Sequence, residues 1–175
     1  MTAEATTITL ADLVLLEDER VAHTLCMRGS REIRIMRQRA VTELDAALWR
    51  LRDCQPLPDD ALAARLLVAL NDVVTRDLAT VVHPDDLELA LRFWEDLATR
   101  APEGYAAPPW TIRAILCWQR GDRRAALFDA WAALDDDEDY TMAHYVVQAC
   151  RHALPTPDEW TDGAVGERRA RLGGG

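Results

Sequence analysis

The chain has 175 residues, 49% of them hydrophobic, and a formal net charge of −10 at pH 7. This length supports one domain with a well-packed core and is too short for two large domains. All 20 basic residues are Arg, and the absence of Lys excludes a Walker-type phosphate lysine, a Schiff-base lysine and a lysine general base.

The cellular compartment is indicated by the cysteines and the N-terminus. The four cysteines are widely spaced and form no CxxC pair, which is typical of reduced thiols packed as small apolar groups: Cys26, Cys54, Cys117 and Cys150. The chain has no run of about eighteen apolar residues and no basic-then-apolar leader. We therefore expect a cytoplasmic protein without a membrane span.

The elements expected along the first half of the chain are helices, except for one short strand candidate. That candidate is TTITL at residues 6–10. A long helix is expected from Ser30 to about Cys54, and a second over residues 58–72, opened by Pro58-Asp59-Asp60.

The clearest helical period lies in HPDDLELALRFWEDLATRAP, residues 83–102. Pro84 suits the first helical position, and Arg100 and Pro102 mark the end of the helix. A further helix over 108–120 begins at Pro108-Pro109. The apolar face of the first of these helices comprises Leu87, Ala90, Leu91, Trp94, Leu97 and Ala98.

The segment that starts at Trp110 carries small residues where a tetratricopeptide unit of about 34 residues has them. Gly121 permits a turn between two helices, and alanines let the two backbones approach closely. YTMAHYVVQACRHAL then predicts a third helix. The small positions are Ala114, Gly121, Ala126 and Ala133, and the larger side chains expected to fill the next layer are Leu127, Trp131 and Leu134.

These patterns predict an all-α fold, a tetratricopeptide-like helical repeat or α-solenoid-like bundle of about seven to nine helices. One domain is expected over residues 1–160. Residues 161–175 lack an apolar stripe and end in glycines, so we expect a disordered tail there.

Several blocks resemble a known family in their order along the chain: NDVVTRD, FWEDLATRAP, APPWTIRAILCWQRGDRRAAL and the following AL–DDEDY pattern. They are similar to the C-terminal helical part of an uncharacterised, mainly actinobacterial group, the domain of unknown function family 4192. The resemblance covers roughly residues 57–155, and the Gly-rich, strand-like N-terminal portion usual in that family is not evident. It implies a helical fold and no catalytic residue, because the family has no assigned activity.

Two departures from the family pattern lie in the segment from Gly121 to Tyr140. The family turn GDGALA reads GDRRAA here, and the DP-x-Y motif lacks its proline, with Glu138-Asp139-Tyr140 in its place.

Three conspicuous groups of residues have a structural explanation that we prefer. The acidic run 135–139 lacks the Gly and Glu positions of an EF-hand and predicts a solvated connection between helices. The pairs formed by His23 with Cys26, and by His144 and His152 with Cys150, complete no zinc-type ligand set. Tryptophans at 94, 110, 118 and 131 are expected to pack between helices. We therefore expect no metal and no cofactor.

The Arg distribution is the feature that favours a function. Residues 20–52 contain eight Arg against three acids, whereas the rest of the chain has twelve Arg against 27 acids. Residues three apart on a helix lie along one face. The candidate interaction residues are Arg28, Arg31, Arg34, Arg37 and Arg39.

Three roles fit this Arg stripe: a solvated face paired with acids of neighbouring helices, a contact with an acidic protein surface that includes a second copy of the chain, or a phosphate-binding face. Helical-repeat folds present extended surfaces for partners. We therefore predict a non-enzymatic protein–protein interaction or scaffold module, with a nucleic-acid-associated regulatory protein that uses the Arg-rich helix 28–39 as the alternative. A chain with this acidic balance repels nucleic acid over most of its surface.

Overall fold

In the computed structural model, the described residues are 8, 9, 13, 30–53 and 55–154. Within these ranges the chain forms helices and no strand, which confirms the all-α prediction. The repeat arrangement stays a prediction, and Arg28, residues 161–175 and most of the strand candidate lie outside the described residues. The helices are α2 Ser30–Arg52, α3 Asp60–Ala69, α4 Val73–Ala79, the 3-10 helix η1 Pro84–Asp86, α5 Leu87–Arg100, α6 Ala107–Gln119, α7 Arg123–Asp136 and α8 Thr141–Arg151.

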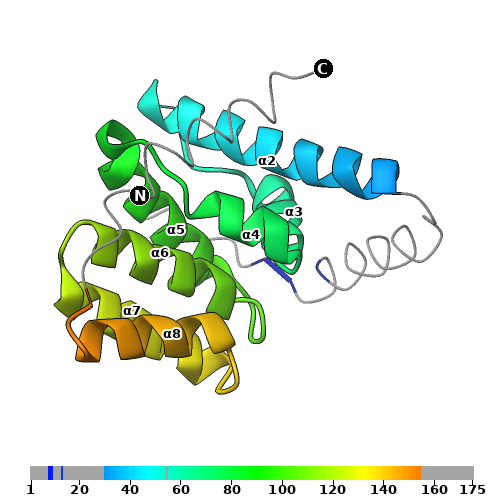
Figure 1. Cartoon of the computed structure of the whole chain (residues 1–175). Helices are drawn as coiled ribbons and strands as arrows, with labels where there is room; N and C mark the ends of the chain where they lie inside the picture. Colours follow the sequence, from blue (N-terminus) through cyan, green and yellow to red (C-terminus); the bar gives the residue numbers. More distant parts are fainter. Residues whose placement is uncertain (1–7, 10–12, 14–29, 54, 155–175) are drawn as a thin grey trace.

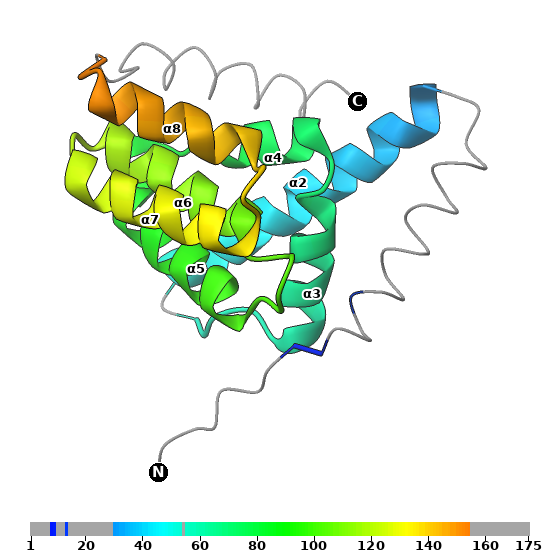
Figure 2. The same cartoon turned by 90° about the horizontal axis from the view of Figure 1, so that it is seen from below.

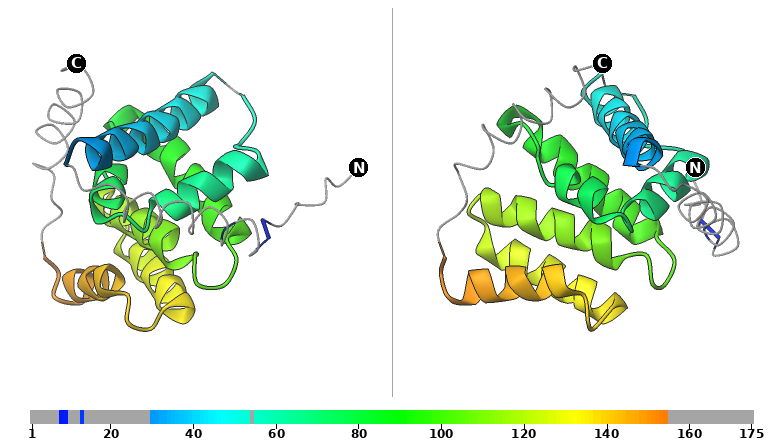
Figure 3. Two further views of the ribbon diagram at one scale, coloured as in Figure 1. Left: turned by 90° about the vertical axis from the view of Figure 1, so that its right-hand side faces the viewer. Right: turned by 45° about the vertical axis from the view of Figure 1, so that its right-hand side comes forward.

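The described helices stack broadly in sequence order. Helix α2 packs on α3, α4 and α5, whereas α6 packs on α5, α7 and α8. Figure 1 shows α2 along one side of the molecule, α7 and α8 along the opposite side, and α5 and α6 between them. The right-hand view of Figure 3 shows the same order. No described helix has the length and apolarity needed to cross a bilayer.

Helix α5 supplies the largest side chains of the core. The apolar face predicted for it is confirmed, except that Leu87 is only half-buried. Trp94 and its neighbour Phe93 are fully buried, and their rings meet edge to face with centroids 4.9 Å apart. The α-helix itself begins at Leu87 because residues 84–86 form a 3-10 turn that follows the His83 cap.

Aspartate side chains fix the starts of three helices. Asp59 accepts a hydrogen bond from the Leu62 amide at the start of α3, as the Pro58-Asp59-Asp60 opening indicated. Asp122 accepts one from the Ala125 amide at the start of α7. The third cap, Asp72, opens the short helix α4, which follows the helix predicted over residues 58–72 and was not itself predicted.

The contact between α6 and α7 has the small-residue character that the sequence predicted. The alanines at this contact are fully buried, and Gly121 turns the chain with a φ of +86°, a value that favours glycine. The prediction for the neighbouring stripe is wrong at Trp131, whose side chain is 48% exposed, because it lies on the side of α7 away from the core. The buried alanines are Ala114, Ala126, Ala130 and Ala133.

The acidic run 135–139 at the end of α7 is exposed, as we expected, except at Asp136. Asp136 is half-buried and accepts three backbone N–H hydrogen bonds at the start of α6. Its Oδ1 lies 2.8 Å from the Gly104 nitrogen, and its Oδ2 lies 2.9 Å from the Ala106 nitrogen and 2.8 Å from the Ala107 nitrogen. A carboxylate is favourable there because the first amides of a helix have no partner within it.

The α6–α7 contact leaves no room for a larger side chain at Ala126, whose exposure is 0%. We expect Ala126→Trp to lower the free energy of unfolding by about 3 kcal/mol or more, because the indole would force the two helices apart. Urea denaturation measures this loss. Ala61→Trp, the same change at an exposed position of α3, is the control, and an equal loss in both variants would contradict the packing explanation.

Asp136 and Asp135 provide a matched pair of adjacent acids. Asp136→Asn should lower the free energy of unfolding by about 1–3 kcal/mol, because an amide group would place N–H donors against the backbone donors that the carboxylate now satisfies. Asp135 is exposed, so Asp135→Asn should change stability by less than about 0.5 kcal/mol. Denaturation midpoints that fall equally in the two variants would contradict a capping role for Asp136.

Candidate functional site

Helix α2 is buried along only part of its length. Its buried side chains are Val41, Leu44 and Ala47, which recur every three residues and face the domain. None of the described side chains between Arg31 and Ala40 is buried. Figure 2 shows this N-terminal end of α2 extending past the neighbouring helices. The first three turns of α2 therefore offer an uncovered helical surface.

The Arg residues predicted to form one stripe divide into two groups. Arg31 and Arg34 are exposed and form no ion pair with a described residue. Arg39 approaches Glu43 at 3.5 Å, one turn further along the helix. Arg37 turns toward the domain, and its partner is Asp72 at the start of α4. The stripe therefore combines two cations that pair with no described residue, called the free cations below, with two that the fold already uses.

The pair between Arg37 and Asp72 attaches α2 to α4. The Arg37 Nε lies 3.0 Å from both carboxylate oxygens, and its Nη2 lies 2.9 Å from Oδ2. The Asp72 Oδ1 also accepts the Thr75 amide at 2.9 Å. Burial alone would raise the pKa of Asp72, but the bonds from Arg37 and Thr75 outweigh it and hold that pKa below 3.8.

Apolar side chains accompany the free cations on the outward face of α2. Ile35 is 56% exposed and lies one turn from Arg31 and Arg39, and Trp49 is 61% exposed near the other end of the helix. A surface that combines guanidinium groups with an exposed aliphatic side chain suits a protein partner, because such contacts join a small apolar centre to charged edges. We call Arg31, Arg34 and Ile35 the α2 face.

The other conspicuous residues do not assemble into a site in the described part of the chain. No group of three His, Cys, Asp or Glu side chains there is placed to hold a metal ion. Cys150 is buried, whereas His144 and His152 are exposed. His144 instead contacts the Glu138 carbonyl at 2.8 Å. Trp94 is buried, and Trp110 and Trp118 are half-buried. The pair His23 and Cys26 lies outside the described residues.

A buried polar cluster between α6 and α7 escaped the sequence-based prediction. Asp129 is fully buried and forms an ion pair with Arg113, whose guanidinium also lies over the Trp110 ring, 5.8 Å from its centroid. The Cys117 Sγ lies 3.5 Å from Asp129 Oδ2. The sequence feature that could have indicated this cluster is Asp129 itself, an acid three positions after Ala126 on the small-residue face.

The electrostatics of this cluster favour a structural role. Burial, followed by the nearby Asp129 charge, raises the pKa of the Cys117 thiol to about 12, and burial also raises the pKa of Asp129. The thiol is therefore protonated near neutral pH and can donate to the carboxylate. A protonated, buried thiol is a poor nucleophile, so this cluster holds α6 against α7 and offers no reactive group.

The two kinds of Arg on α2 should respond differently to truncation. Arg37→Ala should lower the free energy of unfolding at pH 7 by about 1–2 kcal/mol, because it leaves Asp72 without its ion-pair partner in a partly exposed position. Arg34→Ala should change stability by less than about 0.5 kcal/mol.

The stabilisation from Arg37 should also depend on pH. Because the folded-state pKa of Asp72 is lowered, the stabilisation is present above the ordinary carboxyl pKa and is lost as the pH falls through the lower folded value. Denaturant titrations of both variants between pH 7 and acid conditions measure this. A difference between the wild type and Arg37→Ala that grows as the pH falls would contradict the assignment.

Comparisons with known proteins bear on the whole chain. No curated protein and no solved structure matches it. A family model described as "Domain of unknown function (DUF4192)" matches residues 3–156, a region that extends well before the residues 57–155 on which the sequence blocks rest. The chain therefore belongs to the domain of unknown function family DUF4192.

Proposed function

We propose that the chain is a non-enzymatic protein–protein interaction module whose contact surface is the α2 face. The observation that carries this proposal is the exposure of Arg31, Arg34 and Ile35 on a stretch of helix that has no buried side chain among its described residues. Two unpaired guanidinium groups beside an exposed aliphatic side chain favour a partner that presents carboxylates around an apolar centre.

The partner that we propose is a second copy of the chain. Its acidic segment, residues 135–139 at the end of α7 and in the connection to α8, contains exposed carboxylates that form no ion pair with a described residue: Asp135, Asp137, Glu138 and Asp139. In Figure 1 the N-terminal end of α2 lies at the upper right, and the acidic segment lies at the bottom of the molecule, where α7 leads into α8. In the dimer that we propose, a twofold axis relates the two copies, and each α2 face meets the acidic segment of the other copy.

Charge also explains the conditions under which this contact would form. Two chains of net charge −10 repel each other at a distance. At about 0.15 M salt the Debye length is about 8 Å, so this repulsion is screened while ion pairs in direct contact persist.

The net charge also disfavours nucleic acid, although α2 itself carries six Arg against three acids. The cytoplasmic location predicted from the cysteines fits such a module and stays a prediction.

Self-association can be measured directly by sedimentation velocity on the full chain at about 0.1 mM protein and about 0.15 M salt. The wild type should sediment with the mass of two chains. The variant Arg31→Glu plus Arg34→Glu should sediment as one chain, because it places carboxylates against carboxylates. The control Arg92→Glu plus Arg124→Glu reverses two other exposed Arg that form no ion pair with a described residue and should leave the dimer intact.

A charge exchange identifies the opposing surface. A chain with Asp135→Arg and Glu138→Arg should also be monomeric alone, and mixing it with the Arg31→Glu, Arg34→Glu variant should restore a two-chain species. Wild type that stays monomeric at this concentration, or equal loss in the Arg92, Arg124 control, contradicts the proposal. A monomer that binds duplex DNA with a steep salt dependence, lost in Arg31→Glu plus Arg34→Glu, replaces it with the nucleic-acid alternative.

A further inference from the structure

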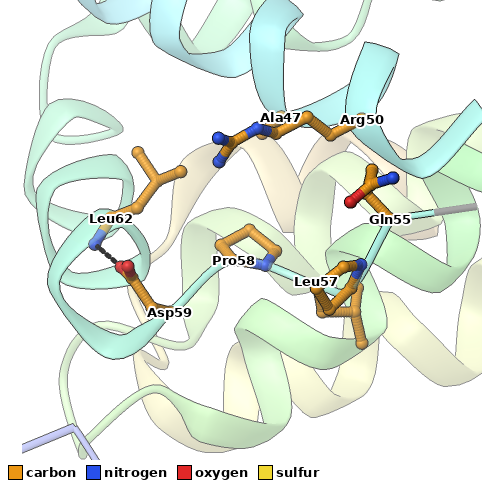
Figure 4. A pocket seen from close by; sticks show the side chains of 8 residues that line it. Ala47, Arg50, Gln55, Leu57, Pro58, Asp59 and Leu62 are labelled. Atoms are coloured by element: carbon orange, nitrogen blue, oxygen red, sulfur yellow. Dashed lines mark hydrogen bonds between the residues drawn. The ribbon is translucent and has the colours of Figure 1, made fainter. Parts of the chain in front are cut away.

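A pocket of about 210 Å³ lies between the C-terminal end of α2 and the chain that leads into α3. Its walls combine polar side chains with an aliphatic part that includes Leu57, Pro58 and Leu62 (Figure 4). Its volume is below the range of about 300–1,000 Å³ that is usual for drug-sized ligands. The pocket therefore suits a small molecule or a single residue of a peptide.

Arg50 supplies the positive charge of this pocket. Figure 4 shows its side chain extending from α2 across the pocket toward Leu62 and Pro58. Arg50 forms no ion pair with any described residue. The nearby guanidinium groups are neutralised: Arg52 pairs with Asp86 at 2.7 Å, and Arg100 pairs with Asp60 and Asp96. Arg50 is therefore available to an anionic ligand.

The other polar side chains of the pocket are those of Asp59 and Gln55. The Asp59 Oδ1 accepts the Leu62 amide at 2.8 Å, so that carboxylate is held as the cap of α3. The backbone N–H of Gln55 donates to the backbone carbonyl of Arg50, with the two atoms 2.9 Å apart, and this bond holds the connection against the end of α2. These two hydrogen bonds hold the backbone that carries the aliphatic wall beside the end of α2.

We propose that this pocket binds a carboxylate that carries a short aliphatic group, with the carboxylate on the Arg50 guanidinium and the aliphatic group against Leu57, Pro58 and Leu62. A guanidinium group matches a carboxylate through two parallel N–H···O bonds, and contact between the aliphatic wall and an apolar chain is favourable because it removes apolar surface from water. Either a free short-chain carboxylic acid or the C-terminal residue of a peptide presents this chemistry. The site lies at the opposite end of α2 from the α2 face and is independent of it.

The test is a titration of the full chain that is monitored by NMR. The reporters are the backbone amide signals of Gln55, Leu57 and Leu62 and the Nε–H signal of Arg50. The probes are 3-methylbutanoate, its neutral amide, and N-acetyl-Gly-Pro-Leu with either a free or an amidated C-terminus. We expect saturable shifts for a carboxylate probe, with a dissociation constant on the order of 1 mM, and none for its amide.

Two variants identify the residue responsible. Arg50→Gln should weaken binding by roughly fivefold or more. Arg34 lies on the same helix but outside the pocket, is exposed and has no ion-pair partner in the described part of the chain, so Arg34→Gln should bind like the wild type. Binding of the free acid indicates a small-molecule ligand, and binding of the peptide alone indicates a peptide terminus. Absence of saturable shifts with both carboxylates, equal shifts from the amides, or unchanged binding by Arg50→Gln overturns the proposal.

Discussion

The close approach of α6 and α7 is the constraint on which the rest of the fold depends. The alanines at this contact have no exposed surface, and the ion pair between Arg113 and Asp129 lies within the same contact. A buried carboxylate is costly unless its partner is correctly placed, so this pair penalises any other register of the two helices. Asp136 adds a second constraint because it ties the end of α7 to the start of α6.

The outer helices are held by a different mechanism, in which a guanidinium group on one helix meets the polar start of another. Arg37 of α2 bonds the cap of α4, and Arg100 of α5 bonds Asp60 at the start of α3. In each pair the Arg side chain donates to an aspartate at the N-terminal end of a helix, where the first backbone amides have no acceptor within the helix. These attachments leave the first turns of α2 uncovered, and that geometry is the basis of the proposed contact surface.

Both proposals depend on cations that the fold does not use. Most of the described Arg side chains that face a neighbouring helix have a carboxylate or carbonyl partner, such as Arg120 with Glu88 at 2.7 Å. Arg31 and Arg34 at one end of α2, and Arg50 near the other end, have no such partner among the described residues. An unpaired guanidinium group beside exposed or aliphatic side chains is therefore what distinguishes these places from the structural ion pairs.

The sequence by itself determined the helical class, the apolar face of α5, the turn at Gly121 and the alanine contact, because each depends on local periodicity or on backbone freedom. Only the tertiary structure decided which polar groups meet. Arg37 and Arg34 are equivalent in the sequence pattern, yet one is anchored to Asp72 and the other is exposed. Asp136 and Asp135 differ in the same way. Such pairings join helices distant in sequence, and the spacing of residues along one helix does not encode them.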